Sequence, residues 1–107
     1  MNSDEKQNNS FEKIVSDVRN ALRIKSINFD EEIKDCINAC LKDLSLIGIS
    51  SSKLNQYDDP LIKKAIYNYS KAEFGQENPD SEKYRAAYEN LRLKLSISSE
   101  YTEEIVK

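Results

Sequence analysis

Histidine and tryptophan are absent from the 107 residues of the sequence, and glycine and proline occur only twice each. Histidine is the side chain most often used as a general base or a metal ligand, so its absence argues against both kinds of site. The scarcity of glycine and proline argues against a fold with many tight turns. We therefore expect a helical protein that is not an enzyme and that binds no metal or other cofactor.

The charges are nearly balanced. The chain has sixteen Lys and Arg residues and nineteen Asp and Glu residues, which gives a net charge of −3. A dedicated nucleic-acid-binding protein usually has a strong basic excess. Charged residues make up 33% of the chain, above the quarter or so that is usual, and this composition is typical of helices with solvated faces.

The sequence also lacks long hydrophobic runs. None approaches the roughly 20 apolar residues that a membrane-spanning helix needs. The first residues, Met1–Asn9, are polar and do not have the apolar centre of a signal peptide. We expect no membrane association, and synthesis in the cytoplasm.

The two cysteines, Cys36 and Cys40, are four residues apart. In a helix they share one face, where a disulfide between them would be strained. As half of a metal site they lack the remaining ligands. We interpret both as small apolar packing residues.

Hydrophobic periodicity predicts an all-α fold, a compact four-helix domain with a long C-terminal helix and flexible termini. The first helix begins near Ser10, a good N-cap residue, and ends near Lys25. The second follows a capping box formed by Asn28 and Glu31, and it ends at Gly48. Its helical template is matched by the apolar residues Ile33, Cys36, Ile37, Cys40, Leu41 and Leu44.

A polar loop is expected over 49–58, and Leu54 and Tyr57 should pack it against the rest of the protein. Two helix starts follow, each with a capping residue directly before a proline. Asp59–Pro60 begins a third helix that runs to Phe74, and Asn78–Pro79 begins a fourth that runs to Ile97. The third helix is apolar nearly all round, which predicts that it is the most buried.

These boundaries divide the chain into a disordered arm over 1–9, a helical domain over 10–97 and a flexible C-terminal tail over 98–107. The tail is polar and acidic, with Tyr101, Ile105 and Val106 as possible anchors. We expect it to be mobile in the free protein and to become ordered against a partner.

Apolar residues exceed what one core needs. The fourth helix carries a main stripe that includes Tyr84, Tyr88 and Leu91, and a second stripe of Ala86, Leu93 and Ile97. Tyrosine is enriched both in cores and in protein–protein interfaces, so both interpretations stay open. The candidate interface residues are Tyr67, Phe74, Ala86, Leu93, Ile97 and Tyr101.

The order of segments resembles a known family. The segments are Ala21–Lys25, Phe29–Ile33 with its continuation to Leu44, Asp59–Ile66 with an aromatic-rich continuation to Phe74, and Asn78–Tyr84 leading to Leu95. Over residues 18–101 the chain resembles the small head–tail connector (adaptor) proteins of long-tailed bacteriophages, which are also labelled DNA-packaging proteins.

The resemblance implies a structural virion protein at the head–tail interface, assembled in the host cytoplasm. Such adaptors form a ring, about twelvefold, below the capsid portal protein. The ring extends the DNA channel and meets the stopper or tail-completion protein. Double-stranded DNA passes through without sequence-specific binding, which agrees with the lack of a basic excess.

A different function class stays open beside this one. A small helical DNA-binding regulator would use the basic residues of the third and fourth helices, namely Lys63, Lys64, Lys71 and Arg92. The acidic net charge and the absence of helix-turn-helix spacing argue against it.

Overall fold

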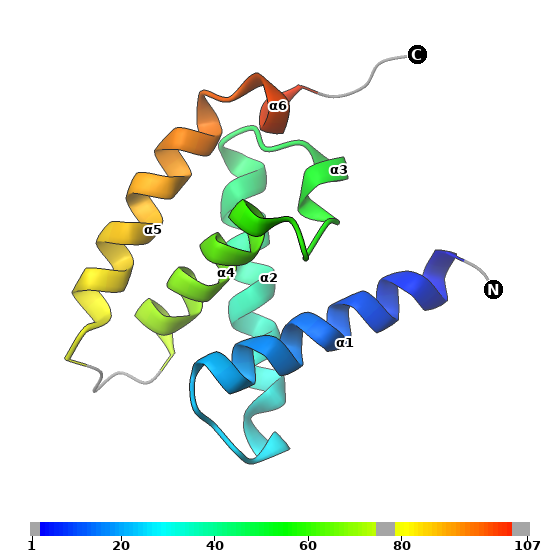
Figure 1. The fold of residues 1–107 in the computed structure, drawn as a ribbon, viewed down its shortest axis with the longest axis vertical. Coiled ribbons are helices and arrows are strands. Elements are labelled where there is room, and N and C mark those ends of the chain that lie inside the picture. The colour runs from blue at the N-terminus through cyan, green and yellow to red at the C-terminus, as the bar shows by residue number, and fades with distance from the viewer. Residues whose placement is uncertain (1–2, 75–78, 104–107) are drawn as a thin grey trace.

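The computed structural model describes residues 3–74 and 79–103, and it is all-helical over these residues. The elements are α1 (Ser3–Ala21), the 3₁₀ helix η1 (Ile27–Phe29), α2 (Asp30–Leu46), α3 (Ser51–Leu54), α4 (Pro60–Glu73), α5 (Ser81–Ser96) and α6 (Ser99–Thr102). In Figure 1, α2 and α4 lie in the middle, with α5 on one side and α1 and α3 on the other. The molecule is thin, with extents of 46 × 37 × 19 Å.

Helix α4 is the centre of the core, as its sequence predicts. It packs against α5, α2 and α1. Five of its 14 residues are buried, against four of the 17 in α2. The buried residues of α4 are Ile62, Ala65, Ile66, Ser70 and Ala72. Because it is enclosed by three helices, α4 fixes the positions of the others.

The predicted stripe of α2 faces this core. Ile33, Ile37, Cys40 and Leu44 are all fully buried. Cys36 is half-buried, and neither cysteine forms a disulfide. Burial raises the pKa of the Cys40 thiol to about 12, so this group packs as a neutral apolar side chain, as we expected.

Two helix C-termini have the same hydrogen-bonded geometry. After α2, the N–H groups of Gly48 and Ile49 donate to the carbonyls of Ser45 and Leu44. Gly48 has φ +100°, the left-handed conformation of a Schellman motif, which confirms the predicted stop. The same pattern ends α1, where the left-handed position is occupied by Arg23 with φ +62°.

The connection from α1 to α2 is closed by a bidentate ion pair. Arg19 donates from Nε and Nη2 to the two carboxylate oxygens of Asp30, at 2.9 and 2.8 Å. These hydrogen bonds lower the pKa of the Asp30 carboxyl. The first residue of α2 is thereby tied to the last turn of α1.

Three predicted helix starts differ from the structure. Helix α1 begins at Ser3 and not near Ser10, so residues 3–9 are helical where a disordered arm was predicted. Once the apolar part of a helix is fixed by packing, adding turns at its end costs little, even without apolar residues. The capping box at Asn28 is also absent: Asn28 lies in η1, and its backbone N–H donates to the Ser26 side-chain oxygen, which caps this short helix.

The fourth predicted helix is shorter than expected. Helix α5 begins at Ser81 after Asp80, and the predicted cap residue Asn78 lies outside the described residues. The start at Asp59–Pro60 is confirmed, because the Asp59 carboxylate accepts from the N–H groups of Leu61 and Ile62 at 3.0 and 3.2 Å. The aspartate therefore satisfies two of the free donors at this helix start.

The polar loop before α4 is more ordered than predicted. Residues 51–54 form the short helix α3, and the buried Ser50 side chain caps it by accepting from the N–H of Lys53. Leu54 and Tyr57 pack against the core, as expected.

Candidate docking surfaces

The second stripe of α5 is exposed to solvent along its whole length. Ala86 is exposed, Leu93 is 64% exposed and Ile97 is 79% exposed. We call these three residues the α5 ridge. The main stripe of the same helix is turned inward, since Tyr88, Leu91 and Leu95 are buried. The two stripes predicted from the sequence therefore lie on different faces, and only one of them is used by the core.

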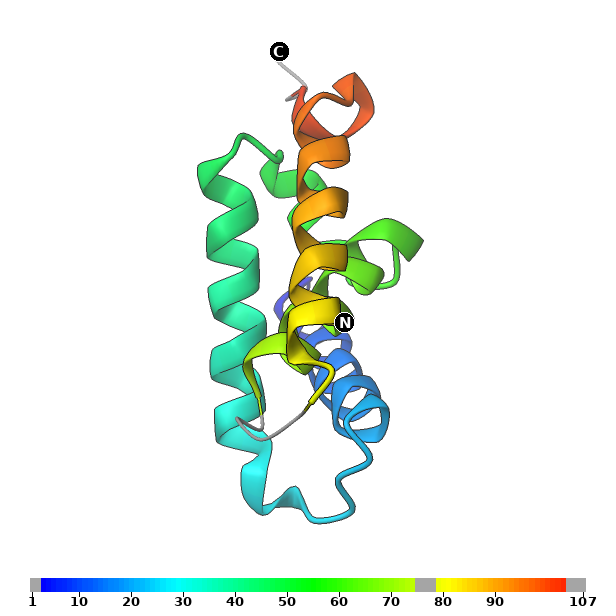
Figure 2. The ribbon, with the colours of Figure 1, turned by 90° about the vertical axis from the view of Figure 1, so that its left-hand side faces the viewer.

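Leu46 extends the apolar surface beyond α5. Helices α2 and α5 run in the same direction and approach each other near their C-terminal ends (Figures 1 and 2). They face each other where Arg92 meets Asp43, at 2.8 Å. Each residue of a helix is rotated by about 100° around the helix axis from the one before it. Leu46, three residues after Asp43, is therefore displaced from it by about 60° in one direction around the axis of α2. Leu93, one residue after Arg92, is displaced by about 100° in the other direction around the axis of α5. Both rotations bring the side chain to the same face, and Leu46 is 73% exposed.

A second apolar patch lies where α1 turns into α2 and α4 ends, at the end of the molecule opposite α6 (Figure 1). Ile27 is 70% exposed, and Phe29 is 45% exposed. The Phe29 ring packs edge-to-face on Phe74, with 6.1 Å between the ring centroids. We call these three residues the η1 patch.

The six predicted interface residues are thus not brought together on one surface. Ala86, Leu93 and Ile97 form the α5 ridge, and Phe74 belongs to the separate η1 patch. Tyr67 is partly buried against the core. Pattern analysis missed Leu46, Ile27 and Phe29. Leu46 falls outside the inward-facing template of α2, which is the signal that could have identified it as an outward-facing apolar residue.

Tyr101 is part of the core and not a mobile anchor, which corrects the prediction for the start of the tail. It lies in α6 and is only 6% exposed. Its backbone carbonyl accepts from the N–H of Ser50 at 2.8 Å. The sequence alone did not show a binding site for its ring, because that site is formed by residues 42 to 51 positions earlier. The other proposed anchors, Ile105 and Val106, lie outside the described residues.

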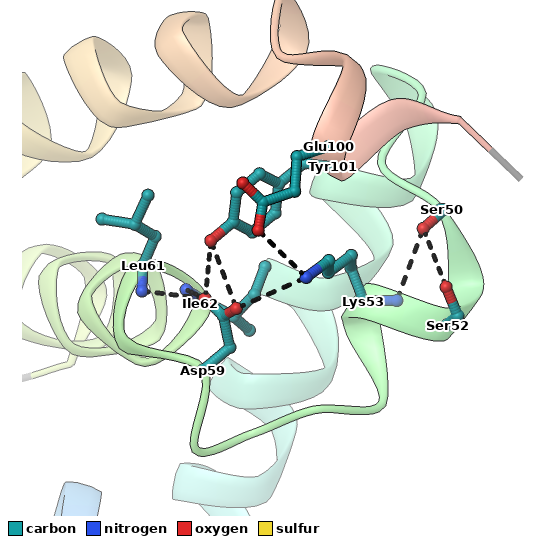
Figure 3. Close-up of polar contacts among 8 residues, drawn as sticks. All are labelled: Ser50, Ser52, Lys53, Asp59, Leu61, Ile62, Glu100 and Tyr101. Atoms are coloured by element: carbon teal, nitrogen blue, oxygen red, sulfur yellow. Dashed lines mark hydrogen bonds and ion pairs between the residues drawn. The ribbon is translucent and has the colours of Figure 1, made fainter.

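The polar end of Tyr101 is held by the start of α4 (Figure 3). Its hydroxyl donates to the two carboxylate oxygens of Asp59, at 3.0 and 3.2 Å. Lys53 lies 3.8 Å from Asp59 and 3.4 Å from Glu100, with its ammonium 4.9 Å from the centre of the Tyr101 ring. Burial, with the hydrogen bond to Asp59, raises the pKa of Tyr101 to about 12. One carboxylate thus both caps α4 and fastens α6.

A second polar cluster joins α2 to α5. The Tyr88 hydroxyl donates to Asp43 at 2.6 Å, and Arg92 donates to the same carboxylate at 2.8 Å. Tyr69 packs edge-to-face on Tyr88, at 5.1 Å between centroids. Burial raises the pKa of the Tyr88 hydroxyl. These tyrosines belong to the core of the domain, with the hydroxyl of Tyr88 satisfied by a charged partner.

The basic residues of α4 and α5 do not form a continuous free surface. Lys63 pairs with Asp17 at 3.3 Å, and Arg92 pairs with Asp43. The Lys71 ammonium lies 5.0 Å from the centre of the Tyr84 ring. Lys64 is exposed. Pairing with carboxylates leaves fewer charges to neutralise phosphates.

The concave features are small. The pocket lined by Asp43, Glu73 and Arg85 holds about 180 Å³, below the roughly 300–1,000 Å³ of typical ligand sites. Among the described residues, no group of three or more His, Cys, Asp or Glu side chains is placed to hold a metal ion, and no helix is long and apolar enough to cross a membrane. The surface features that stand out are the exposed apolar residues of the α5 ridge and the η1 patch, which suit contact with other proteins.

Comparison with known families gives one match. The family model described as "Phage connector protein" matches residues 14–102. No curated protein and no solved structure matches the chain. The matched range begins at Ile14, a buried residue of α1, and ends with α6, so it includes all the residues of the buried core cluster.

Proposed function

Because the chain belongs to the phage connector protein family, we propose that it is a structural virion protein that joins the head of a bacteriophage to its tail. The observation that carries this proposal is the family match over residues 14–102, which spans the packed helices. A role in assembly requires surfaces for other proteins and no catalytic groups. The α5 ridge and the η1 patch supply the first requirement.

The finer proposal concerns the place of the chain in the particle. Copies form a closed ring, about twelvefold, below the capsid portal protein, and the ring extends the DNA channel toward the stopper or tail-completion protein. One feature supports it. The α5 ridge and the η1 patch are two separate apolar surfaces, and a part that joins two assemblies needs a contact surface for each.

The charge distribution supports passage of DNA without sequence-specific binding. The net charge is −3, and Lys63 and Arg92 are paired with carboxylates. A channel wall with few free basic groups holds phosphates weakly, so that DNA can slide. Neither the family match nor this pairing favours a DNA-binding regulator.

A complementation assay tests the role. Phage grown with a stop codon in this reading frame should yield DNA-filled heads without tails, and adding the purified chain should restore tail joining and infectious titre. Phe29→Asp, which charges the η1 patch, should lower joining at least about tenfold, because a buried charge costs several kcal/mol in an interface. Lys64→Glu, a charge change on the exposed side of α4, is the control and should join normally. Tailed, infectious particles that lack the chain would refute the proposal.

A further inference from the structure

The exposed face of α5 has the residue pattern of a two-stranded coiled coil. Residues 83, 90 and 97 take the a positions of a heptad, and residues 86 and 93 take the d positions. These five positions are occupied by Lys83, Ala86, Asn90, Leu93 and, at the C-cap directly after α5, Ile97, and all five are exposed. We call them the heptad seam. The core-facing residues of α5 lie at other heptad positions, so the seam is not a by-product of core packing.

The side chains of the seam are those that favour a parallel pair. Ile97 at an a position with Leu93 at a d position favours two strands. Asn90 occupies an a position, where asparagine pairs with its own copy across a two-fold axis and fixes the register, at some cost in stability. Lys83 lies in the first turn, at the open end of the seam, where its long side chain can reach solvent.

The flanking charges are complementary to those of the same helix in a second copy. Glu82 and Glu89 occupy the g positions along one side of the seam, and Lys94 occupies an e position along the other. In a parallel pair, a g residue faces the e residue five positions later on the other helix. Glu89 of each copy therefore faces Lys94 of the other, twice per dimer. An antiparallel pair would place like charges together.

Within one copy of the chain, the flanking glutamates form only weak ion pairs. Glu89 lies 3.8 Å from Arg92, and Glu82 lies 3.7 Å from Arg85. Both glutamate side chains remain largely exposed, at 60% and 86%. Ion pairs at these distances on an exposed helix are weak, so they can be exchanged for contacts across an interface.

We propose that the heptad seam binds α5 of a second copy of this chain, with the two helices parallel and in register about a two-fold axis. Leu46 lies on the same face and adds apolar area at one end of the contact. Such an isologous contact closes on itself as a dimer and cannot propagate around a ring. The dimer is therefore a state of the free protein that covers the α5 ridge until assembly. The contact itself is argued from α5 alone, whereas its place before assembly rests on the proposed connector role.

Sedimentation of the purified full-length chain, over concentrations up to about 1 mM, tests the contact through its charges. Glu89→Lys alone and Lys94→Glu alone should each raise the dimer dissociation constant about tenfold or more, because each creates two like-charge pairs. The double variant, Glu89→Lys with Lys94→Glu, should restore the original value. Lys64→Glu on α4 is the matched control and should have no effect.

A cross-link tests the register. Leu93→Cys places two thiols opposite each other at a d position, so mild oxidation should give a dimer that a reductant dissolves. The unchanged chain, whose Cys36 is half-buried and whose Cys40 is buried, supplies the background. A chain that stays monomeric at all concentrations would overturn the proposal. So would single charge reversals that leave association unchanged, or a double variant that is no better than the singles.

Discussion

Two buried hydroxyl groups, those of Ser70 and Tyr101, differ in whether they form a hydrogen bond. The Oγ of Ser70, in the last turn of α4, is fully buried and has no hydrogen-bond partner within the described part of the chain. The hydroxyl of Tyr101 donates to a carboxylate. An unsatisfied buried polar group costs about 1–3 kcal/mol, so the first residue weakens the fold and the second strengthens it.

Ser70→Ala should therefore raise the free energy of unfolding by about 1 kcal/mol, because it removes an unsatisfied hydroxyl and introduces a better helix former. Denaturant unfolding measures the change. Ser96→Ala is the matched control, since the Ser96 hydroxyl donates to the carbonyl of Leu93 at 2.7 Å. A loss of stability in Ser70→Ala would show that the hydroxyl has a partner.

The buried Tyr101 and Cys40 predict loss of stability at alkaline pH. Each has a pKa raised to about 12 by burial. A group whose pKa is raised by folding contributes its full stability below the unfolded pKa, and it loses that contribution as the pH rises toward the folded pKa. The free energy of unfolding should then fall from about pH 9 to pH 12, since unfolded cysteine and tyrosine ionise near 8.5 and 10.

The substitution Tyr101→Phe distinguishes the contribution of Tyr101 to this pH dependence from that of the Cys40 thiol. It should lower stability at neutral pH by about 1–3 kcal/mol, because it removes a hydrogen bond to a charged acceptor. It should also make the decline above pH 10 shallower, because the phenyl ring does not titrate. Urea unfolding across this pH range supplies both values. An equally steep decline in the variant would contradict the burial of the hydroxyl.

At the scale of the element, the two Schellman motifs provide a natural comparison. Arg23 and Gly48 occupy equivalent left-handed positions after α1 and α2. A side chain in this conformation costs roughly 1 kcal/mol relative to glycine. Arg23→Gly should thus stabilise the protein by about that amount, and Gly48→Ala should destabilise it similarly, as measured by thermal unfolding. If both substitutions changed stability in the same direction, the comparison would fail.

Helix α6 is a second element with a testable contribution. Deleting residues 98–107 should lower stability by about 3–5 kcal/mol, the cost of losing a large buried aromatic side chain. This reverses the expectation from the sequence, which placed the whole segment outside the fold. Glu103→Ala, at an exposed position of the same segment, should leave the unfolding temperature nearly unchanged. A deletion that unfolds at the temperature of the intact chain would show that Tyr101 is not part of the core.

The sequence predicted those elements whose signals are local. The stripe of α2, the Asp59–Pro60 start and the Gly48 stop depend on residues within a few positions of each other, and all three are confirmed. The extension of α1 to Ser3 depends on propagation of the helix from its packed part. The packing of α6 depends on a site formed by Ser50, Lys53 and Asp59, which lie far away in the sequence. Neither leaves a periodic pattern in the segment itself.

At the scale of the whole molecule, the sequence predicted the exposed apolar residues of one surface but not their arrangement. The α5 ridge was recognisable as a stripe separate from the core stripe of the same helix. The position of Leu46 on the same face could not be predicted, because it depends on how the parallel helices α2 and α5 approach each other. They do so at the Asp43–Arg92 ion pair. Likewise, Phe29 and Phe74 are 45 residues apart in sequence and meet only in the fold.

This arrangement gives a thin molecule with two separate exposed apolar surfaces, and the family match relates it to the phage connectors. The most direct measurement is to locate the chain in purified virions by gold labelling and electron microscopy. We expect label at the junction of head and tail in the labelled particles. Label confined to the tail tip or the capsid surface, or the absence of the chain from complete virions, would contradict a connector role.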